Sequence, residues 1–390
     1  MYRSLIILIL CVSYAPLSAQ QYLPLHSSAI VADGHNDILW RVMSGGEMES
    51  RATTGHSDLP RFREGGMDIQ LFSIWVPSEK TGDDAWQFAL DEIDSLKAIA
   101  ARNPAALQLA TKPGDMDRIL SGGKLAGVIA LEGGRCIDGR RDRILELYRR
   151  GLRSFGLTWN HSSDWASCSK DESTGKVKGG LSEKGKSFVR LLDSLGVLID
   201  LSHLGERAFW DVAANSSHPL FASHSASKAL RDHHRNLTDA QLRAVAKSGG
   251  VVMTNFFPGF IVSNMNEKRV KRLREFEKKA AALKKKHPKR GKDYMKEYDR
   301  MVAAAKKEGI CTIDDVVAHI DHAVRIAGAE HVGLGSDFDG INLTPVGLND
   351  VTDLPMLTRS LMKKGYSADQ IRGILGGNFL RVWRAVVENG

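Results

Sequence analysis

Short apolar runs alternate with stretches of helical periodicity along most of the chain. Eight of these runs have the length and residue types of buried strands. They cover residues 29–33, 68–75, 126–133, 152–160, 196–203, 219–225, 250–256 and 331–338. Apolar residues recur with helical spacing over residues 83–102, 139–150, 182–195, 238–249 and 312–328. Because the strand runs are almost continuously apolar, they predict a parallel sheet covered by helices.

The number of strand runs predicts the architecture. Eight strands close a (β/α)8 barrel of the TIM type, and 390 residues are enough for such a barrel with insertions. An open doubly wound sheet is the alternative, and a glycine-rich dinucleotide loop after the first strand would favour it. The residues there, "DGHND" at 33–37, are not such a loop. We therefore expect an α/β protein with one TIM-like barrel domain over residues 21–390.

The N-terminal segment departs from this pattern. Residues 1–20 contain Arg3, an apolar run that ends at Val12, and small residues before a cleavage point near Ala19. This arrangement is typical of a secretory signal peptide, so we expect an exported protein, periplasmic or secreted. The apolar run is too short to span a bilayer, and no later run is long enough. We therefore expect no transmembrane segment after cleavage.

A basic segment lies between the seventh and eighth strand runs. Residues 268–308 hold 17 Lys and Arg against 6 Asp and Glu, a net charge of +11 in a chain whose total is +8. One interpretation is an arm that binds a polyanion or a membrane surface. The other is a solvated helical insertion, because Val270, Leu273, Phe276 and Leu283 have roughly helical spacing. Aromatic residues are sparse, which favours the helical insertion and argues against a nucleic-acid partner.

Ligand-type side chains stand at the C-terminal ends of the strand runs. They are His35, Asp37, Glu132, Trp159, Asn160, His161, His203, His224, Asn255 and Asp337. In a barrel these ends form one ring around one mouth, where active sites are built. The i, i+2 spacing of His35 and Asp37 places both side chains on one face of an extended chain. Glu132 would be costly to bury unless it is paired or bound to a metal.

These residue types predict a metal site. Imidazole and carboxylate ligands without a thiolate suit zinc, and also manganese, iron or cobalt. Cys136, Cys168 and Cys311 are scattered and odd in number, so they indicate neither a cysteine metal site nor a disulfide framework. Each ligand-type residue alone could be a turn residue or a structural histidine. Their joint pattern on five strands exceeds the needs of one zinc and suits two ions that share a carboxylate.

The sequence also resembles a known family. The motifs that carry the resemblance are "DGHND", "LEGG", "LIDLSH", "SHS", "HRNLTD", "VVMTNF", "GLGSDFDG" and "GGNFLRVW", between residues 33 and 383. By these motifs the chain is similar to the membrane dipeptidase (renal dipeptidase) family of zinc peptidases, within the metal-dependent amidohydrolases. The resemblance implies a metallopeptidase that hydrolyses dipeptides, with D-configured C-terminal residues among the candidate substrates. It also implies a homodimer.

The resemblance implies roles for individual residues. His35, Asp37 and Glu132 match the ligands of one zinc ion. Glu132, His203 and His224 match those of a second, so that Glu132 bridges the two. Asp337 matches the catalytic carboxylate of the family, and Arg235 of "HRN" matches the arginine that binds the substrate carboxylate.

The end of the fourth strand departs from the family pattern. Some relatives carry a histidine directly after "LT", which is credited with steadying the tetrahedral intermediate, and here that position is Trp159. The role then passes to His161, or the chain does without it. Trp159 and Asn160 are expected to line the substrate site. The alternative function is a related amidohydrolase-type enzyme for another small amide, lactam or ester, although the fourth strand ends without the lysine that could carry a bridging carbamate.

Overall fold

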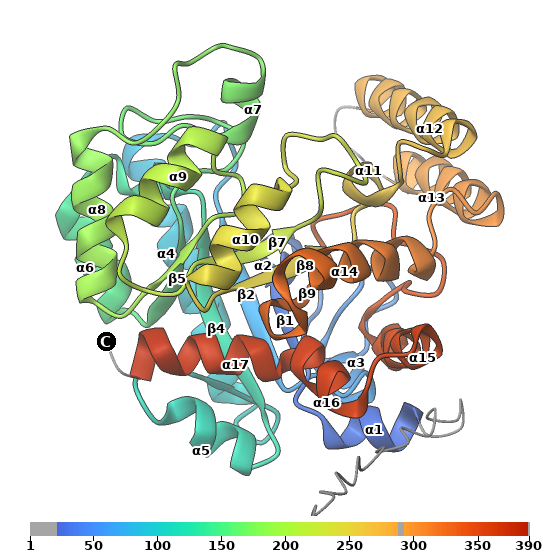
Figure 1. Cartoon of the computed structure of the whole chain (residues 1–390), viewed down its shortest axis with the longest axis horizontal. Helices are drawn as coiled ribbons and strands as arrows, with labels where there is room; N and C mark the ends of the chain where they lie inside the picture. Colours follow the sequence, from blue (N-terminus) through green and yellow to red (C-terminus); the bar gives the residue numbers. More distant parts are fainter. Residues whose placement is uncertain (1–21, 288–291, 389–390) are drawn as a thin grey trace, which may run out of the picture.

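The computed structural model describes residues 22–287 and 292–388, and a closed ring of parallel strands lies at its centre (Figure 1). The ring consists of β1 (Ala32–Asn36), β2 (Ile69–Trp75), β4 (Leu125–Glu132), β5 (Leu152–Gly156), β6 (Leu198–Asp200), β7 (Phe221–Ser225), β8 (Val251–Asn255) and β9 (Val332–Gly335). Pairing of β9 with β1 and of β2 with β4 closes it. Each predicted strand run overlaps one of these strands, so the prediction of a TIM-like (β/α)8 barrel is confirmed.

Helices cover the outside of the barrel (Figure 1). The five predicted helices correspond to α4 (Gly82–Arg102), α6 (Arg141–Arg149), α8 (Glu183–Ser194), α10 (Asp239–Lys247) and α14 (Ile313–Ala327). The remaining α-helices are α1 (Tyr22–Ser28), α2 (Ile38–Met43), α3 (Leu59–Glu64), α5 (Asp115–Ser121), α7 (Ser169–Ser173), α9 (Glu206–Asn215), α11 (Pro258–Ile261), α12 (Glu267–Lys286), α13 (Lys292–Lys307), α15 (Leu354–Lys364), α16 (Ala368–Arg372) and α17 (Asn378–Trp383). Capping boxes at Thr238 and Thr312 begin α10 and α14. Strand β3 (Leu107–Leu109), which pairs with the start of β4, was not predicted because three residues are too few for a clear pattern.

The C-terminal helices close one end of the barrel. Phe379 and Trp383 of α17 join a buried cluster that contains the strand side chains of the barrel interior. The ring centroids of Phe379 and Phe221 lie 5.8 Å apart. Because Phe221 and Val251 are the first residues of β7 and β8, this cluster lies at the N-terminal end of the strands. The opposite end, where the strands finish, is left for the mouth.

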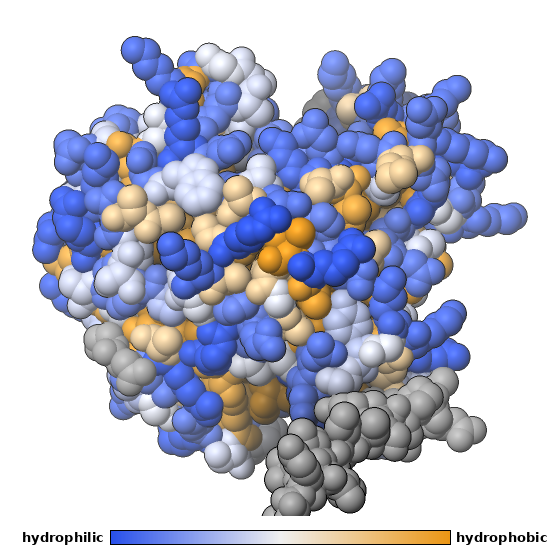
Figure 2. All heavy atoms as spheres, in the orientation of Figure 1, coloured by the Kyte–Doolittle hydropathy of each residue, from blue (hydrophilic) through white to orange (hydrophobic). Residues whose placement is uncertain are grey.

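The basic segment forms two helices, α12 and α13, which project from the barrel beside α11 (Figure 1). Val270, Leu273 and Leu283 of α12 are buried, which agrees with their helical spacing. Arg269 forms an ion pair with Asp315 at the start of α14 and so attaches the base of the insertion to the barrel. The surface around these helices is mainly hydrophilic (Figure 2). The segment is therefore a packed helical insertion between β8 and β9.

Three further expectations concern the N-terminus, membrane spans and cysteines. The predicted signal peptide, residues 1–20, lies outside the described residues. In the part of the chain that is described, no helix is both long and apolar enough to cross a membrane. Cys136, Cys168 and Cys311 are buried and free, in agreement with the absence of a disulfide framework.

A buried histidine fixes the loops on one side of the mouth. His319 of α14 accepts a hydrogen bond from the backbone N–H of Ser227 at Nδ1 (3.0 Å) and donates from Nε2 to the carbonyl of Ile261 (3.1 Å). One ring nitrogen accepts and the other donates, which is the pattern of a neutral imidazole. Burial lowers the pKa of His319 to about 4, although the Ile261 carbonyl opposes the shift.

This histidine should make stability depend on pH. Its folded-state pKa is below the ordinary value of 6.5, so its contribution is complete above pH 6.5 and is lost as the pH falls toward about 4. Between pH 7 and pH 5 the wild type should lose about 2 kcal/mol more unfolding free energy than His319→Gln. Urea titrations of both metal-stripped proteins at the two pH values measure this difference. Equal losses in the two proteins would contradict it.

Candidate metal centre

A cavity of about 610 Å³ opens at the C-terminal ends of the strands. Its wall contains seven of the predicted site residues: Asp37, Glu132, Trp159, Asn160, His203, Arg235 and Asp337. His35 and His224 are buried, with 3% and 1% of their surfaces exposed, and they contact the lining residues Glu132 and His203. The barrel therefore brings together residues that are separated by up to 302 positions in the sequence.

The "DGHND" stretch forms the end of β1 and the entry to α2. Gly34 has to be glycine because a Cβ there would lie 2.2 Å from the carbonyl oxygen of Ser223 on β7. The buried carboxylate of Asp33 accepts hydrogen bonds from the backbone N–H and the hydroxyl of Ser336, at 2.6 and 2.7 Å. This pairing joins β1 to the end of β9. The turn-forming residues thus hold His35 and Asp37 at the mouth.

Glu132 lies at the centre of the cluster, and its two oxygens face different partners. Oε2 lies 3.7 Å from Nε2 of His35. Oε1 lies 3.0 Å from Nε2 of His203 and 3.6 Å from Nε2 of His224. Asp37 Oδ2 also lies close to His35 Nε2, at 3.3 Å. Both oxygens of the carboxylate thus face imidazole nitrogens, an arrangement that suits a metal-ligating carboxylate.

The imidazoles of His203 and His224 approach each other through their Nε2 atoms. His203 donates from Nδ1 to the amide oxygen of Asn160 at 3.2 Å. His224 donates from Nδ1 to the hydroxyl of Ser223 at 2.7 Å, and this hydroxyl donates in turn to Asp200. The two Nε2 atoms lie 3.0 Å apart. With both Nδ1 atoms donating outward, the Nε2 lone pairs point into the cluster, which suits a cation beside them, and the outer hydrogen bonds are typical of metal-ligating histidines.

The charges of the cluster lead to the same conclusion. Burial, with the positive charges of Arg235 and His35, holds the pKa of His203 and of His224 well below its ordinary value. Burial disfavours the His35 imidazolium, but the carboxylates of Asp37 and Glu132 outweigh it and raise the pKa of His35. Burial also raises the pKa of Glu132. Two carboxylates and three imidazoles buried together thus form a set that a bound cation would stabilise.

Groups of ligand atoms close enough for one ion occur twice among the described residues. His35, Glu132 and His224 form one group, and His35, Asp37 and Asp337 form the other. In each group the ligand atoms lie within 4.8 Å of one another. His35 Nε2 is shared by both groups and has no hydrogen-bond partner although it is buried. The donor set fits a divalent cation, and zinc suits imidazole and carboxylate ligands.

Asp337 is held in a left-handed backbone conformation, with φ of 62°. His203 shares this feature, with φ of 68°. Such strain in residues other than glycine is concentrated at functional sites. The side-chain amide of Asn255 donates to Asp337 Oδ2 at 3.0 Å, while burial raises the pKa of Asp337. Gly340 leaves room for both aspartates, because a Cβ there would lie 2.0 Å from Asp37 Oδ2.

Arg235 lies in the wall of the cavity with 3% of its surface exposed. Its guanidinium donates to the carbonyl of His224 at 3.3 Å and lies over the ring of Phe260, whose centroid is 5.4 Å away. Its Nε has no hydrogen-bond partner. Burial lowers the pKa of Arg235 to about 10, which leaves the group charged at neutral pH. A buried charged group with a free donor suits recognition of an anion that enters the cavity.

The remaining predicted residues follow β5, and they differ in whether they line the main cavity. Trp159 lies in the cavity wall and packs edge-on against Trp75, with ring centroids 5.0 Å apart. Asn160 orients His203. His161, in contrast, is exposed, and its ring packs 5.8 Å from that of Trp159, beside a small neighbouring pocket. His161 is not among the residues that line the main cavity in the described structure. Its catalytic role stays a prediction, and this geometry does not support it.

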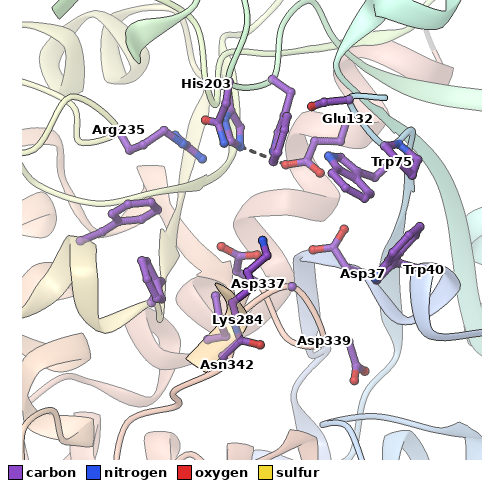
Figure 3. Close-up of a pocket in the computed structure, with 18 of the residues that line it drawn as sticks. Asp37, Trp40, Trp75, Glu132, His203, Arg235, Lys284, Asp337, Asp339 and Asn342 are labelled. Atoms are coloured by element: carbon purple, nitrogen blue, oxygen red, sulfur yellow. Dashed lines mark hydrogen bonds and ion pairs between the residues drawn. The ribbon is translucent and has the colours of Figure 1, made fainter. Parts of the chain in front are cut away.

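Several residues of the site had no role assigned from the sequence. Trp40 and Trp75 form an aromatic wall on the opposite side of the cavity from Arg235 (Figure 3). The sequence marked Asn255 only by its position at the end of a strand run, which it shares with the candidate ligands. Lys284 of the basic insertion also lines the cavity. No pattern in the sequence places a residue of the insertion at the mouth.

Comparison with known proteins agrees with this geometry. A family model described as membrane dipeptidase, peptidase family M19, matches residues 19–390. The probable dipeptidase PvdM from Pseudomonas aeruginosa superposes with a TM-score of 0.77 at 26% identity, over 95% of this chain and 99% of that one. A dipeptidase AC of the same peptidase family gives 0.75 at 27%, over 92% and 99%. A Rhodobacter sphaeroides metallopeptidase, liganded with a phosphinate mimic of L-Ala-D-Ala, gives 0.74 at 26%, over 92% and 99%.

Proposed function

The chain belongs to the membrane dipeptidase family, peptidase family M19, and on this basis we propose that it is a dipeptidase with two zinc ions at the mouth of its barrel. Membership makes it a metal-dependent peptide hydrolase. His35, Asp37 and Glu132 would hold one ion, and Glu132, His203 and His224 the other. The observation that carries the proposal is the buried position of Glu132 between imidazoles, with Oε1 3.0 Å from Nε2 of His203 and Oε2 3.7 Å from Nε2 of His35. Bound divalent cations would supply Lewis acidity toward a water molecule and a peptide carbonyl.

The residues around the ligands have complementary tasks. Asp337, oriented by Asn255, would take a proton from the attacking water and deliver it to the leaving amine. Arg235 would bind the free carboxylate of the substrate with its unpaired donors. The aromatic wall of Trp40, Trp75 and Trp159 would exclude water from the amino-terminal side of the substrate. We assign no task to His161.

Arg235 would restrict the enzyme to short substrates. A carboxylate held by Arg235 places the scissile bond one residue from the C-terminus, so a dipeptide fills the space over the metal ligands. The proposal includes dipeptides with a D-configured C-terminal residue, and the phosphinate mimic of L-Ala-D-Ala on the Rhodobacter sphaeroides relative supports this inclusion. We also propose that the protein is exported after removal of residues 1–20 and that it forms a homodimer.

A substrate panel tests the proposed function. The purified protein should hydrolyse L,L- and L,D-dipeptides in the presence of zinc, and tripeptides at least about a hundredfold more slowly, because a longer chain moves the carboxylate away from Arg235. Removal of metal with a chelator should abolish activity, and added zinc should restore it. Manganese and cobalt added in place of zinc identify the preferred metal.

Three outcomes would contradict the proposal. Activity that survives complete metal removal would exclude the metal mechanism. Tripeptides hydrolysed as fast as dipeptides would exclude the role of Arg235. Hydrolysis of lactams or esters without hydrolysis of dipeptides would favour the alternative, an amidohydrolase-type enzyme for another small substrate.

A further inference from the structure

The basic insertion contributes one side chain to the wall of the cavity. Lys284, near the C-terminal end of α12, lines the cavity together with Asn342 and Phe260. In Figure 3 it lies on the same side of the mouth as Asp337 and Asn342. Lys284 is exposed, and the described residues form no ion pair with it. An unpaired ammonium group therefore stands at the rim of the substrate cavity.

The other positive charge of the cavity indicates which part of a substrate Lys284 could bind. Among the cavity-lining residues that the structure describes, Arg235 and Lys284 are the only two with a fixed positive charge. Arg235 lies deep in the wall, and in the proposed function it binds the main-chain carboxylate. Lys284 is then left for a second anionic group of the same substrate. The cavity, at about 610 Å³, has room for a long side chain beside the dipeptide backbone.

The position of Lys284 also indicates which substrate residue it meets. Phe257 and Phe260 line the cavity and belong to the loop and helix that precede the insertion. Phe260 lies against the guanidinium of Arg235. The side chain of the C-terminal substrate residue would start beside the carboxylate that Arg235 would hold, and therefore near Phe260 and the start of the insertion. The tryptophan wall faces the amino-terminal residue instead.

We infer that Lys284 makes the enzyme select dipeptides with an acidic C-terminal side chain, glutamate in particular. This inference rests on the proposed dipeptidase function and names its substrate class. The positive charge of the insertion, +11 over residues 268–308, reinforces the preference by raising the local concentration of anionic substrates. Glutamate suits the site because the ammonium group lies at the rim and needs a long partner.

The test compares isosteric substrate pairs. For Ala-Glu and Ala-Gln of the same stereochemistry, the wild type should show the higher kcat/KM for Ala-Glu. Lys284→Ala should lower this ratio about threefold, because an exposed ion pair is weak. Lys284→Glu should lower it about tenfold, because it replaces the attraction of the substrate carboxylate by a repulsion of similar size. Raising the salt concentration from about 0.05 M to about 0.5 M should lower the wild-type ratio as well. The ratio is the readout, rather than either kcat/KM alone, because Lys284 lines the cavity for both substrates.

A neighbouring lysine provides the matched control. Lys285 is also exposed on α12 but is not among the cavity-lining residues of the described structure. Lys285→Ala should keep the wild-type ratio. If the enzyme hydrolyses Ala-Gln, either of two results would overturn the inference: an equal fall of the ratio in both variants, or no fall of the ratio in Lys284→Ala. A preference for Glu-Ala over Ala-Glu would overturn it too. Failure to hydrolyse any dipeptide with zinc present would instead refute the proposed function.

Discussion

Replacing Asp337 by asparagine is expected to lower kcat about a thousandfold and to leave the two proposed metal ions bound. Asparagine keeps the shape of the side chain and still fits beside Asn255, but it cannot accept and return a proton. Proton transfer by a positioned carboxylate contributes about 10² to 10⁴ to the rate. Because Arg235 and the metal ligands are untouched, KM should change by less than about threefold. Steady-state kinetics with one dipeptide and metal analysis of the same sample measure both effects.

The metal analysis separates two roles of Asp337. This carboxylate forms a possible ligand group with His35 and Asp37, so it could hold an ion rather than transfer a proton. A variant that keeps two ions and loses turnover supports the proton-transfer role. A variant that loses an ion together with activity makes Asp337 a ligand. A variant with wild-type kcat would remove Asp337 from the reaction altogether.

Replacing His35 by alanine should remove metal and activity without unfolding the barrel. Its Nε2 faces both Asp37 and Glu132, so the variant loses the central nitrogen of the ligand set. We expect less than one ion per chain and a fall in kcat/KM of at least about a thousandfold. The fold should persist because the described contacts of the His35 side chain are with other members of the cluster, Asp37, Glu132 and His224. Metal content by mass spectrometry and far-ultraviolet circular dichroism check the two halves of this prediction.

A histidine at the other end of a barrel strand gives the control. His331 precedes β9 and hydrogen-bonds through Nδ1 to the carbonyl of Gly250, at the N-terminal end of the barrel. His331→Ala should keep both ions and most of the activity. If His35→Ala binds two ions as tightly as the wild type does, the assignment of "DGHND" as part of a metal site is wrong.

The barrel was predictable because its strands are buried on both faces. All eight residues of β4 are buried, for example, and the sequence is correspondingly apolar up to Glu132. Once the strands are known, barrel geometry alone requires their C-terminal residues to meet. This is why residues as distant as His35 and Asp337 could be predicted as neighbours. The helix boundaries were predictable to within about two residues where a capping threonine marks the start.

Other parts of the site depend on packing that leaves no local pattern. The contact of Asn160 with His203 and the chain from Asp200 through Ser223 to His224 fix which imidazole nitrogen faces the cluster. Both result from the register of neighbouring strands. The position of Lys284 depends on how α12 packs against α13 and α14, which helical spacing alone does not specify. His161 was expected near the reaction because it is near in sequence, but the chain turns it outward after Asn160.

The central claim is that Glu132 bridges two metal ions, and anomalous X-ray scattering from crystals of the zinc-loaded wild type tests it most directly. Data collected on both sides of the zinc absorption edge give the number, identity and position of the ions in one experiment. We predict two zinc peaks, one between Glu132 and the His35–Asp37 pair, the other between Glu132 and the His203–His224 pair. A single peak, or peaks that do not contact Glu132, would contradict the account.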